Sequence, residues 1–342
     1  MDHTLTQLIA PYRSVSIIGM CKNAGKTTVL NAMIQACSTS NRTLALTSIG
    51  RDGESTDLVT GTQKPGIYVP EGTLIATASQ LLLRHCNISR EILDTTGIPT
   101  PMGEVVLCRA HSAGTVQLAG PSMTAQLARL RENLFQWGAD QVIIDGALSR
   151  KTLCSRNVTD ATVLCTGASY HADPRVVAED TAYHCRLLTL PETRDEAVLQ
   201  HTAQLGEFRG SLFFTNEGIW TPPANLSVAD ALRKPEGSGL HAIFFGGALT
   251  DFAVKPLLMS PVSLDGLQMI VRDSSKLLLS RDSYDKLLRR GVALQVLENV
   301  NLVAVTMNPF SAYGHSCDPT QLKALLQEKI SLPVINVMED AI

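Results

Sequence analysis

The sequence lacks the features that mark several large classes of protein. Its 29 Lys and Arg residues do not outnumber its 32 Asp and Glu residues, and the formal net charge is −3 at pH 7. Without a basic excess to neutralise phosphates, nucleic acid is not an expected partner. No apolar run reaches the roughly 18–20 residues of a membrane span. Residues 1–14 lack the basic start and long apolar stretch of a signal peptide. We therefore expect a cytoplasmic protein with no membrane association.

Metal-binding and disulfide patterns are missing as well. The eight cysteines include no CxxC pair, and neither they nor the eight histidines have the spacing of zinc ligands. Several cysteines lie within apolar, strand-like runs, which is typical of buried free thiols. The sequence therefore predicts reduced cysteines and no Cys–His metal cluster.

The chain does contain a regular alternation of strand-like and helix-like segments. Short apolar runs predict strands, and apolar residues repeating every three to four positions predict helices. The expected strands are 15–18, 43–48, 104–108, 114–118, 141–144, 161–165, 186–190, 211–214, 241–245, 268–271, 302–306 and 333–337. The expected helices are 27–37, 73–83, 121–137, 251–259, 282–290 and one that begins at Asp318-Pro319. This alternation predicts an α/β fold with a mostly parallel sheet flanked by helices.

The strongest motif is the segment 16–28, SIIGMCKNAGKTT, in which a buried strand runs into a glycine-containing loop and then into an amphipathic helix. The backbone N–H groups of such a loop and the helix dipole favour a phosphate at one point. Lys26 can reach terminal phosphates as a point charge, and the Thr27 hydroxyl can ligate Mg²⁺. The candidate nucleotide-binding residues are Gly19, Lys22, Asn23, Ala24, Gly25, Lys26, Thr27 and Thr28.

Acidic residues follow two of the expected strands. Asp145 ends the run QVII, and an acid at the carboxyl end of a buried strand lies where open α/β sheets bind ligands. We interpret Asp145 as a Walker B acid; a helix cap or a turn residue is the alternative. Asp52 and Glu54 follow the strand LALTS and would meet the same edge, unless they only form a solvated turn. The predicted metal ligands are thus Thr27, Asp52 and Asp145, and the predicted catalytic residues are Lys26, Asp52 and Glu54.

The identity of the base is weakly specified. The sequence contains no NKxD, the usual reader of guanine. Asn308 follows the strand LVAVT and Asn216 follows the strand SLFF, and either carboxamide could contact a base edge or a substrate. ATP with Mg²⁺ is the expectation by default.

The loop departs from the usual GxxxxGK[ST] spacing, because Met20 stands five positions before Gly25 and the glycine is one residue earlier. This longer spacing resembles the phosphate loop of dethiobiotin synthetase. The KNAGKTT core is similar to that of the molybdopterin-guanine-dinucleotide adapter (MobB-like) proteins. Both belong to the deviant branch of P-loop NTPases. The resemblance implies a P-loop nucleotide-binding domain, which we place at residues 1–205, and a C-terminal α/β domain or extension at 206–342.

The ParA-like members of this branch imply a homodimer formed across the nucleotides. Their signature lysine precedes the catalytic lysine by five positions, whereas Lys22 precedes Lys26 by four. A phosphate contact by Lys22 within its own chain is therefore at least as plausible as a contact across a dimer.

A further set of strings resembles a smaller family. They are TSIGRDGE (47–54), KPGIYVPEGTLIATA (64–78), AGPS (119–122), IIDGALSRK (143–151) and VAVTMNPFSAYGHSCDP (303–319), together with the glycine loop. This combination resembles the P-loop subunit of the lysine 5,6-aminomutase reactivase of lysine-fermenting bacteria. The resemblance implies an ATP hydrolase that acts with a MutS-related partner subunit on an adenosylcobalamin-dependent aminomutase client. In that scheme Lys26 and Thr27 hold the Mg-nucleotide, Asp145 positions Mg²⁺ through water, and Asp52 or Glu54 orients the attacking water.

Two other functions remain open from the sequence. One is an ATP-dependent ligase of the dethiobiotin synthetase type, which would use the phosphate to activate a carboxylate. The other is a non-catalytic module that binds nucleotide without turnover.

Overall fold

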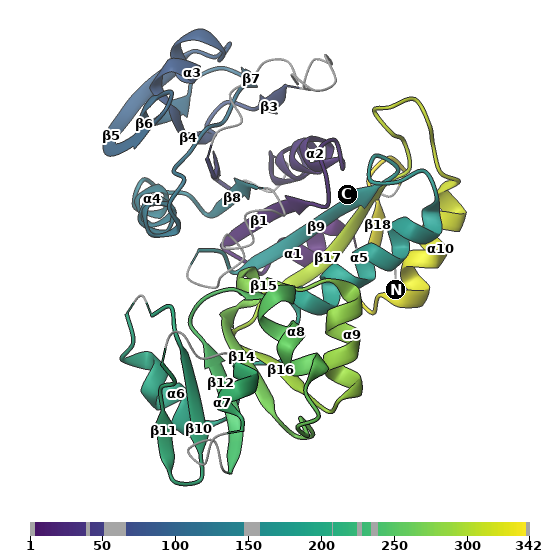
Figure 1. The fold of residues 1–342 in the computed structure, drawn as a ribbon. Coiled ribbons are helices and arrows are strands. Elements are labelled where there is room, and N and C mark those ends of the chain that lie inside the picture. Colours follow the sequence, from purple (N-terminus) through teal and green to yellow (C-terminus); the bar gives the residue numbers. More distant parts are fainter. Residues whose placement is uncertain are drawn as a thin grey trace. The chain divides into compact units, whose positions relative to one another are not determined.

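The computed structural model describes residues 4–38, 42–50, 66–146, 158–206, 208–223, 228–233 and 239–339. The chain forms two compact units, one made of Met1–Ala182 and Asn301–Ile342 and the other of Tyr183–Val300 (Figure 1). This division differs from the expected one between residues 205 and 206. The reason is that the chain after residue 300 returns to the first unit and adds two strands to its sheet.

The first unit is built on a nine-stranded sheet with the order β18-β17-β9-β1-β8-β2-β4-β6-β5. The strands from β18 to β4 run parallel, and the hairpin of β5 and β6 pairs antiparallel with β4. The bounds are β1 (Ser14–Gly19), β2 (Leu44–Ser48), β4 (Leu74–Ala78), β5 (Arg90–Thr100), β6 (Gly103–Ala110), β8 (Gln141–Asp145), β9 (Ala161–Gly167), β17 (Leu302–Asn308) and β18 (Val334–Asn336). A separate ladder pairs β3 (Ile67–Val69) with β7 (Gly114–Val116). The predicted α/β class, with a mostly parallel sheet and flanking helices, is confirmed.

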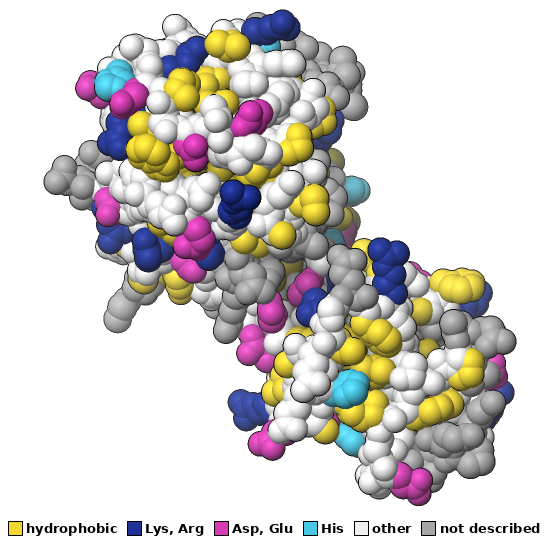
Figure 2. Space-filling model, turned by 90° about the vertical axis from the view of Figure 1, so that its left-hand side faces the viewer, with side chains coloured by type: hydrophobic (Ala, Val, Ile, Leu, Met, Phe, Trp, Pro, Cys, Tyr) yellow, Lys and Arg dark blue, Asp and Glu magenta, His cyan; other side chains and the backbone are white. Residues whose placement is uncertain are grey.

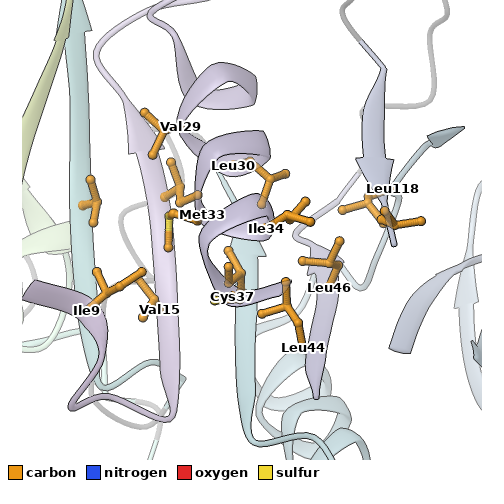
Figure 3. Close-up of a cluster of buried hydrophobic side chains, with 14 of the residues drawn as sticks. Ile9, Val15, Val29, Leu30, Met33, Ile34, Cys37, Leu44, Leu46 and Leu118 are labelled. Carbon is orange, nitrogen blue, oxygen red and sulfur yellow. The ribbon is translucent and has the colours of Figure 1, made fainter. Parts of the chain in front are cut away.

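Helix α2 (Lys26–Ser38) covers the middle of this sheet, because its apolar side packs on β1, β2 and β8. In Figure 3 the side chains of Val29 and Met33 lie on the side of α2 that faces β1, Val15 lies beside Ile9, and Ile34 lies beside Leu46. The other helices with residues in this unit are α1 (Leu5–Ile9), α3 (Ser79–Arg84), α4 (Thr124–Gln136), α10 (Pro319–Lys329) and α5 (Pro174–Leu188), which continues into the second unit. The core beneath α2 holds the strand ends in place for the site described below.

The second unit contains a five-stranded sheet with the order β11-β10-β12-β14-β16. Strands β12, β14 and β16 are parallel, and β10 runs antiparallel to β12. The bounds are β10 (Ser211–Thr215), β11 (Gly218–Trp220), β12 (Leu240–Phe245), β14 (Gln268–Asp273) and β16 (Ala293–Glu298), with the short pair β13 (Leu249–Thr250) and β15 (Leu277–Leu278). Its helices are α6 (Glu196–Ala203), α7 (Val228–Ala231), α8 (Asp251–Met259) and α9 (Arg281–Arg289).

Three local expectations were wrong. Residues 74–78 of the expected helix 73–83 form the strand β4, and only Ser79–Arg84 is helical. Every residue of β4 is buried, and a fully buried strand has no alternation that would distinguish it from a buried helix. Residues 186–188 of the expected strand 186–190 are the end of helix α5, and residues 189 and 190 follow the helix without forming a strand. Strands β6 and β7 do not pair with each other, since each is bonded to a different partner.

Two surface properties follow from the described residues. No helix among them is long and apolar enough to cross a membrane. On the face drawn in Figure 2, Lys and Arg side chains are interspersed with Asp and Glu side chains. The seven cysteines that the structure describes are free thiols, as expected.

Candidate functional site

The glycine loop, defined here as Gly19–Lys26, connects the carboxyl end of β1 to the start of α2. Two of its residues have left-handed backbone: Asn23 with φ 61° and Gly25 with φ 93°. Glycine adopts this conformation without a steric penalty, and Asn tolerates it better than most residues. Because α2 begins at Lys26, the first N–H groups of the helix have no acceptor inside it. The loop therefore presents backbone donors at the positive end of a 13-residue helix.

The Lys26 side chain runs back across the end of β1. A Cβ atom built at Gly19 would lie 3.1 Å from Cγ of Lys26 and 3.2 Å from its Cδ. Gly19 thus leaves the space that the aliphatic part of Lys26 occupies. The ammonium group of Lys26 acts on the neighbouring Cys21 thiol and lowers its pKa, but burial is the larger effect and raises that pKa to about 11. Cys21 is therefore protonated near neutral pH and is no nucleophile there.

Asn308 packs on the glycine loop from β17. A Cβ atom built at Gly25 would lie 3.2 Å from the Cβ of Asn308 and 3.6 Å from its Nδ2. Asn308 is the last residue of β17, and its Oδ1 accepts a hydrogen bond of 3.0 Å from the N–H of Phe310. This leaves the Nδ2 donor beside the loop. Asn216, the other carboxamide considered from the sequence, belongs to the second unit.

Asp145 ends the strand next to β1. In register it lies opposite Ile17 of β1 on one side and opposite Ser48 of β2 on the other. Its backbone oxygen accepts a hydrogen bond of 3.0 Å from the N–H of Ile49. Side chains alternate along a strand, and Ile143 is in the core beneath α2, so the half-buried Asp145 side chain points to the same side. The structure therefore places this carboxylate on the face from which α2 and the glycine loop rise.

The chain leaves β1 and β8 in opposite directions. In the sheet the four strands concerned have the order β9-β1-β8-β2. From β1 the chain passes through α2 to β2, which lies on the other side of β8. From β8 the chain leads to β9, which lies on the other side of β1. In open α/β sheets such a reversal creates a crevice at the carboxyl ends of the two strands, where ligands bind. The glycine loop and Asp145 both stand at this position.

The backbone at Gly120 and Pro121 packs tightly against the carboxyl end of β2. A Cβ atom at Gly120 would lie 1.9 Å from the backbone oxygen of Ser48, so no other residue fits there. The N–H of Gly50 donates a hydrogen bond of 2.8 Å to the backbone oxygen of Pro121. The segments TSIG and AGPS, distant in sequence, thus meet beside Asp145.

The remaining predicted site residues divide into two groups. Thr27 and Thr28 lie half-buried in the first turn of α2, Ala24 is buried, and Lys22 is exposed. Asp52 and Glu54 lie outside the described residues, so their assigned roles stay predictions. Sequence reasoning missed Ser48, because a serine at the end of a buried strand carries no signal that separates a site residue from a structural one.

A magnesium ion fits the oxygen donors that are present. Among the described residues there is no group of three or more His, Cys, Asp and Glu side chains that could hold a metal. Mg²⁺ in phosphate sites typically takes one or two protein oxygens and completes its shell with phosphate oxygens and waters. The Thr27 hydroxyl and the Asp145 carboxylate are of this kind.

One donor in the loop lacks an acceptor. The Nδ2 atom of Asn23 is buried and has no hydrogen-bond partner in the described part of the chain. A buried amide donor without a partner is costly, and an anion in the loop would satisfy it.

Comparisons of the chain with models of protein families, with curated proteins and with solved structures found no match. The fold and the site define an α/β protein in which a glycine loop, a carboxylate and a carboxamide meet at the carboxyl ends of one sheet.

Proposed function

We propose that the protein is a P-loop NTPase that binds a nucleoside triphosphate with Mg²⁺ in the glycine loop and hydrolyses it. The observation that carries this proposal is the close packing of neighbouring side chains on Gly19 and Gly25 in the loop. Gly19 gives space to the stem of Lys26, and Gly25 combines a φ of 93° with the contact to Asn308. A loop of this shape, opening into a long helix, provides the donors that phosphates require.

The proposal assigns roles to the main polar groups of the site. The N–H groups of the loop and the Nδ2 of Asn23 donate to phosphate oxygens, and Lys26 neutralises the terminal phosphates. Thr27 and Asp145 hold the magnesium ion, which when bound neutralises charge on the phosphate oxygens. Asp52 and Glu54 are proposed to orient the attacking water. The Nδ2 of Asn308, which lies beside Gly25, is proposed to donate to the nucleotide, and ATP is the proposed nucleotide.

The narrower proposal is that nucleotide turnover serves a reactivating factor for a lysine 5,6-aminomutase, with a MutS-related partner subunit. It is supported by where the strings that carry the resemblance come together. TSIG contacts AGPS through Gly50 and Pro121, IID ends beside Ser48, and the segment that contains Asn308 packs on Gly25. Residues that a family shares for its function are expected to gather at one site, as these do.

The first experiment compares nucleotide binding and phosphate release by the wild type, Lys26→Ala and Asp145→Ala, with Mg-ATP and Mg-GTP. Lys286→Ala is the control, because Lys286 is exposed and pairs with Asp282 on its own helix, α9. We expect Lys26→Ala to weaken binding by at least tenfold, about 1.4 kcal/mol, since a charge-assisted contact is lost. Nucleotide binding by Asp145→Ala should no longer depend on Mg²⁺. A folded wild type that binds neither nucleotide would contradict the proposal.

A second experiment separates the reactivase from the alternatives. Adding lysine 5,6-aminomutase that carries inactivated cobalamin should raise the rate of phosphate release by a reactivase. A ligase would convert a small carboxylic acid without any protein partner. A non-catalytic module would bind nucleotide tightly and release no phosphate under either condition.

A further inference from the structure

A buried serine at the carboxyl end of β2 has no function in the site as described so far. Ser48 is only 2% exposed, and its Oγ has no hydrogen-bond partner within the part of the chain that the structure describes. An unsatisfied buried hydroxyl costs free energy that a smaller apolar residue would not. Its presence therefore calls for a partner that arrives from outside the chain.

Several other buried hydroxyls of the same sheet are satisfied, although that of Thr306 on β17 also has no hydrogen-bond partner among the described residues. The Ser16 hydroxyl lies 2.8 Å from that of Thr162, and the Thr47 hydroxyl donates to the backbone oxygen of Ala76 at 3.0 Å. Ser48 follows Thr47 directly but points to the opposite side of the strand. A buried hydroxyl in this sheet therefore does not lack a partner as a rule, and the Ser48 position needs its own explanation.

The side chain of Ser48 lies on the face of the glycine loop. Leu44 and Leu46, two and four positions earlier, belong to the core beneath α2, so Ser48 points to the same side. In register it stands directly opposite Asp145. The backbone of Ser48 is held in place by its pairing with β8 and by Gly120, which packs on its carbonyl oxygen. The hydroxyl therefore lies next to the proposed magnesium ligand, with its backbone fixed.

We propose that Ser48 is a positioning residue of the magnesium site, and that its hydroxyl and the Asp145 carboxylate hold a water molecule of the hydrated ion. This inference rests on the proposed function. Strand β8 lies between β1 and β2 in the sheet. Asp145 at the end of β8 therefore stands between Ser48 and the glycine loop, where the phosphates are proposed to bind. A hydroxyl both donates and accepts, as binding of a water requires. Mg²⁺ dehydrates reluctantly and keeps several waters, which protein groups can orient.

The proposal predicts opposite effects on stability and on binding. Without nucleotide, the Ser48 hydroxyl is an unsatisfied group, so Ser48→Ala should leave the melting temperature unchanged or raise it. With nucleotide and Mg²⁺, the same variant lacks a contact to the ion's hydration shell. Its half-saturating Mg²⁺ concentration should rise about tenfold, the equivalent of one hydrogen bond to a charged group.

The test measures binding of a non-hydrolysable ATP analogue over a range of Mg²⁺ concentrations, together with the melting temperature without ligand. The matched control is Ser16→Ala, which removes a buried hydroxyl that is bonded to Thr162 on the neighbouring strand β9. This control should melt at a lower temperature and keep the wild-type dependence on Mg²⁺. Ser48→Cys, which keeps the size and weakens the donor, should change the Mg²⁺ dependence in the same direction as Ser48→Ala.

The outcomes distinguish this inference from the proposed function. If the wild type binds the analogue and Ser48→Ala has the same Mg²⁺ dependence, the inference is overturned and the proposed function stands. A fall in the melting temperature of ligand-free Ser48→Ala as large as that of Ser16→Ala would also overturn it, since Ser48 would then be structural. If the folded wild type does not bind the analogue at any Mg²⁺ concentration, both the proposed function and the inference about Ser48 are overturned.

Discussion

Gly25 and Asn308 come from opposite ends of the chain, yet a Cβ atom at Gly25 would lie 3.2 Å from the Cβ of Asn308. The contact exists because β17 pairs with β9, which in turn pairs with β1, so the carboxyl end of β17 arrives beside the glycine loop. The candidate site is therefore complete only after the last part of the chain has joined the sheet. Both residues can be tested by small substitutions.

Gly25→Ala should abolish or strongly weaken nucleotide binding. The left-handed φ of 93° costs a residue with a side chain about 1–2 kcal/mol, and the new methyl group would press on Asn308. Calorimetric titration with Mg-ATP measures the loss of affinity.

Gly138→Ala is the matched control for this substitution. Gly138 follows α4 with a φ of 94°, and a Cβ there would meet nothing within 4 Å. This variant should have a similar loss of stability and unchanged binding. Equal affinities of the two variants would show that the Gly25 contact does not shape the site.

Asn308→Asp should weaken nucleotide binding more than it changes the fold. The variant keeps the size and the oxygen that accepts from the Phe310 N–H, but it replaces the Nδ2 donor with a negatively charged acceptor. Binding should weaken by about tenfold or more, because the new charge faces a site for anions. Calorimetric titration with Mg-ATP measures the affinity, and an unchanged affinity would remove Asn308 from the site.

The local sequence was sufficient to predict much of the site. The strand that ends at Gly19, the helix that begins near Thr27 and the strand that ends at Asp145 were all expected, since each is a continuous apolar or amphipathic run. These patterns depend on neighbouring residues alone. The glycine loop therefore could be read directly from the chain.

Features that depend on pairing between strands far apart in the sequence could not be predicted from local patterns. The strand 302–306 was expected, but nothing in its residues indicates that it pairs with β9 and not with the preceding strands. The division of the chain into its two compact units, which differs from the expected boundary at residues 205 and 206, depends on the same distant pairing. The unsatisfied hydroxyl of Ser48 also needs the structure, because its significance lies in which partners are missing within the described residues.

Alkaline pH should destabilise the protein through its buried thiols. Burial raises the pKa of the thiols of Cys108 and Cys185 from 9.0 to about 12 in each case. Below pH 9 both folded and unfolded chains keep these protons, so the stability is fully present. Between about pH 9 and 12 the unfolded chain loses its protons first, and the free energy of unfolding falls as pH rises, by up to about 1.4 kcal/mol per pH unit for each thiol.

This pH dependence can be measured by urea unfolding between pH 7 and 10.5. Cys185→Ala should reduce the steepness of the decline above pH 9, whatever its effect at pH 7. Cys86→Ala is the comparison, because Cys86 is only half-buried and burial also raises the pKa of its thiol. An identical slope in the wild type and in Cys185→Ala would contradict the assignment.

A chain that ends at residue 205 should not fold cooperatively. It would lack β17 and β18, which pair in succession with β9. All seven residues of β9 are buried in the full chain, and truncation would turn this strand into an exposed apolar edge that invites aggregation. We expect the fragment 1–205 to be aggregated or to melt without a sharp transition in circular dichroism, whereas the full chain melts cooperatively. A soluble fragment with a sharp transition would show that the first unit does not need the returning strands and that the boundary expected from the sequence is a folding boundary after all.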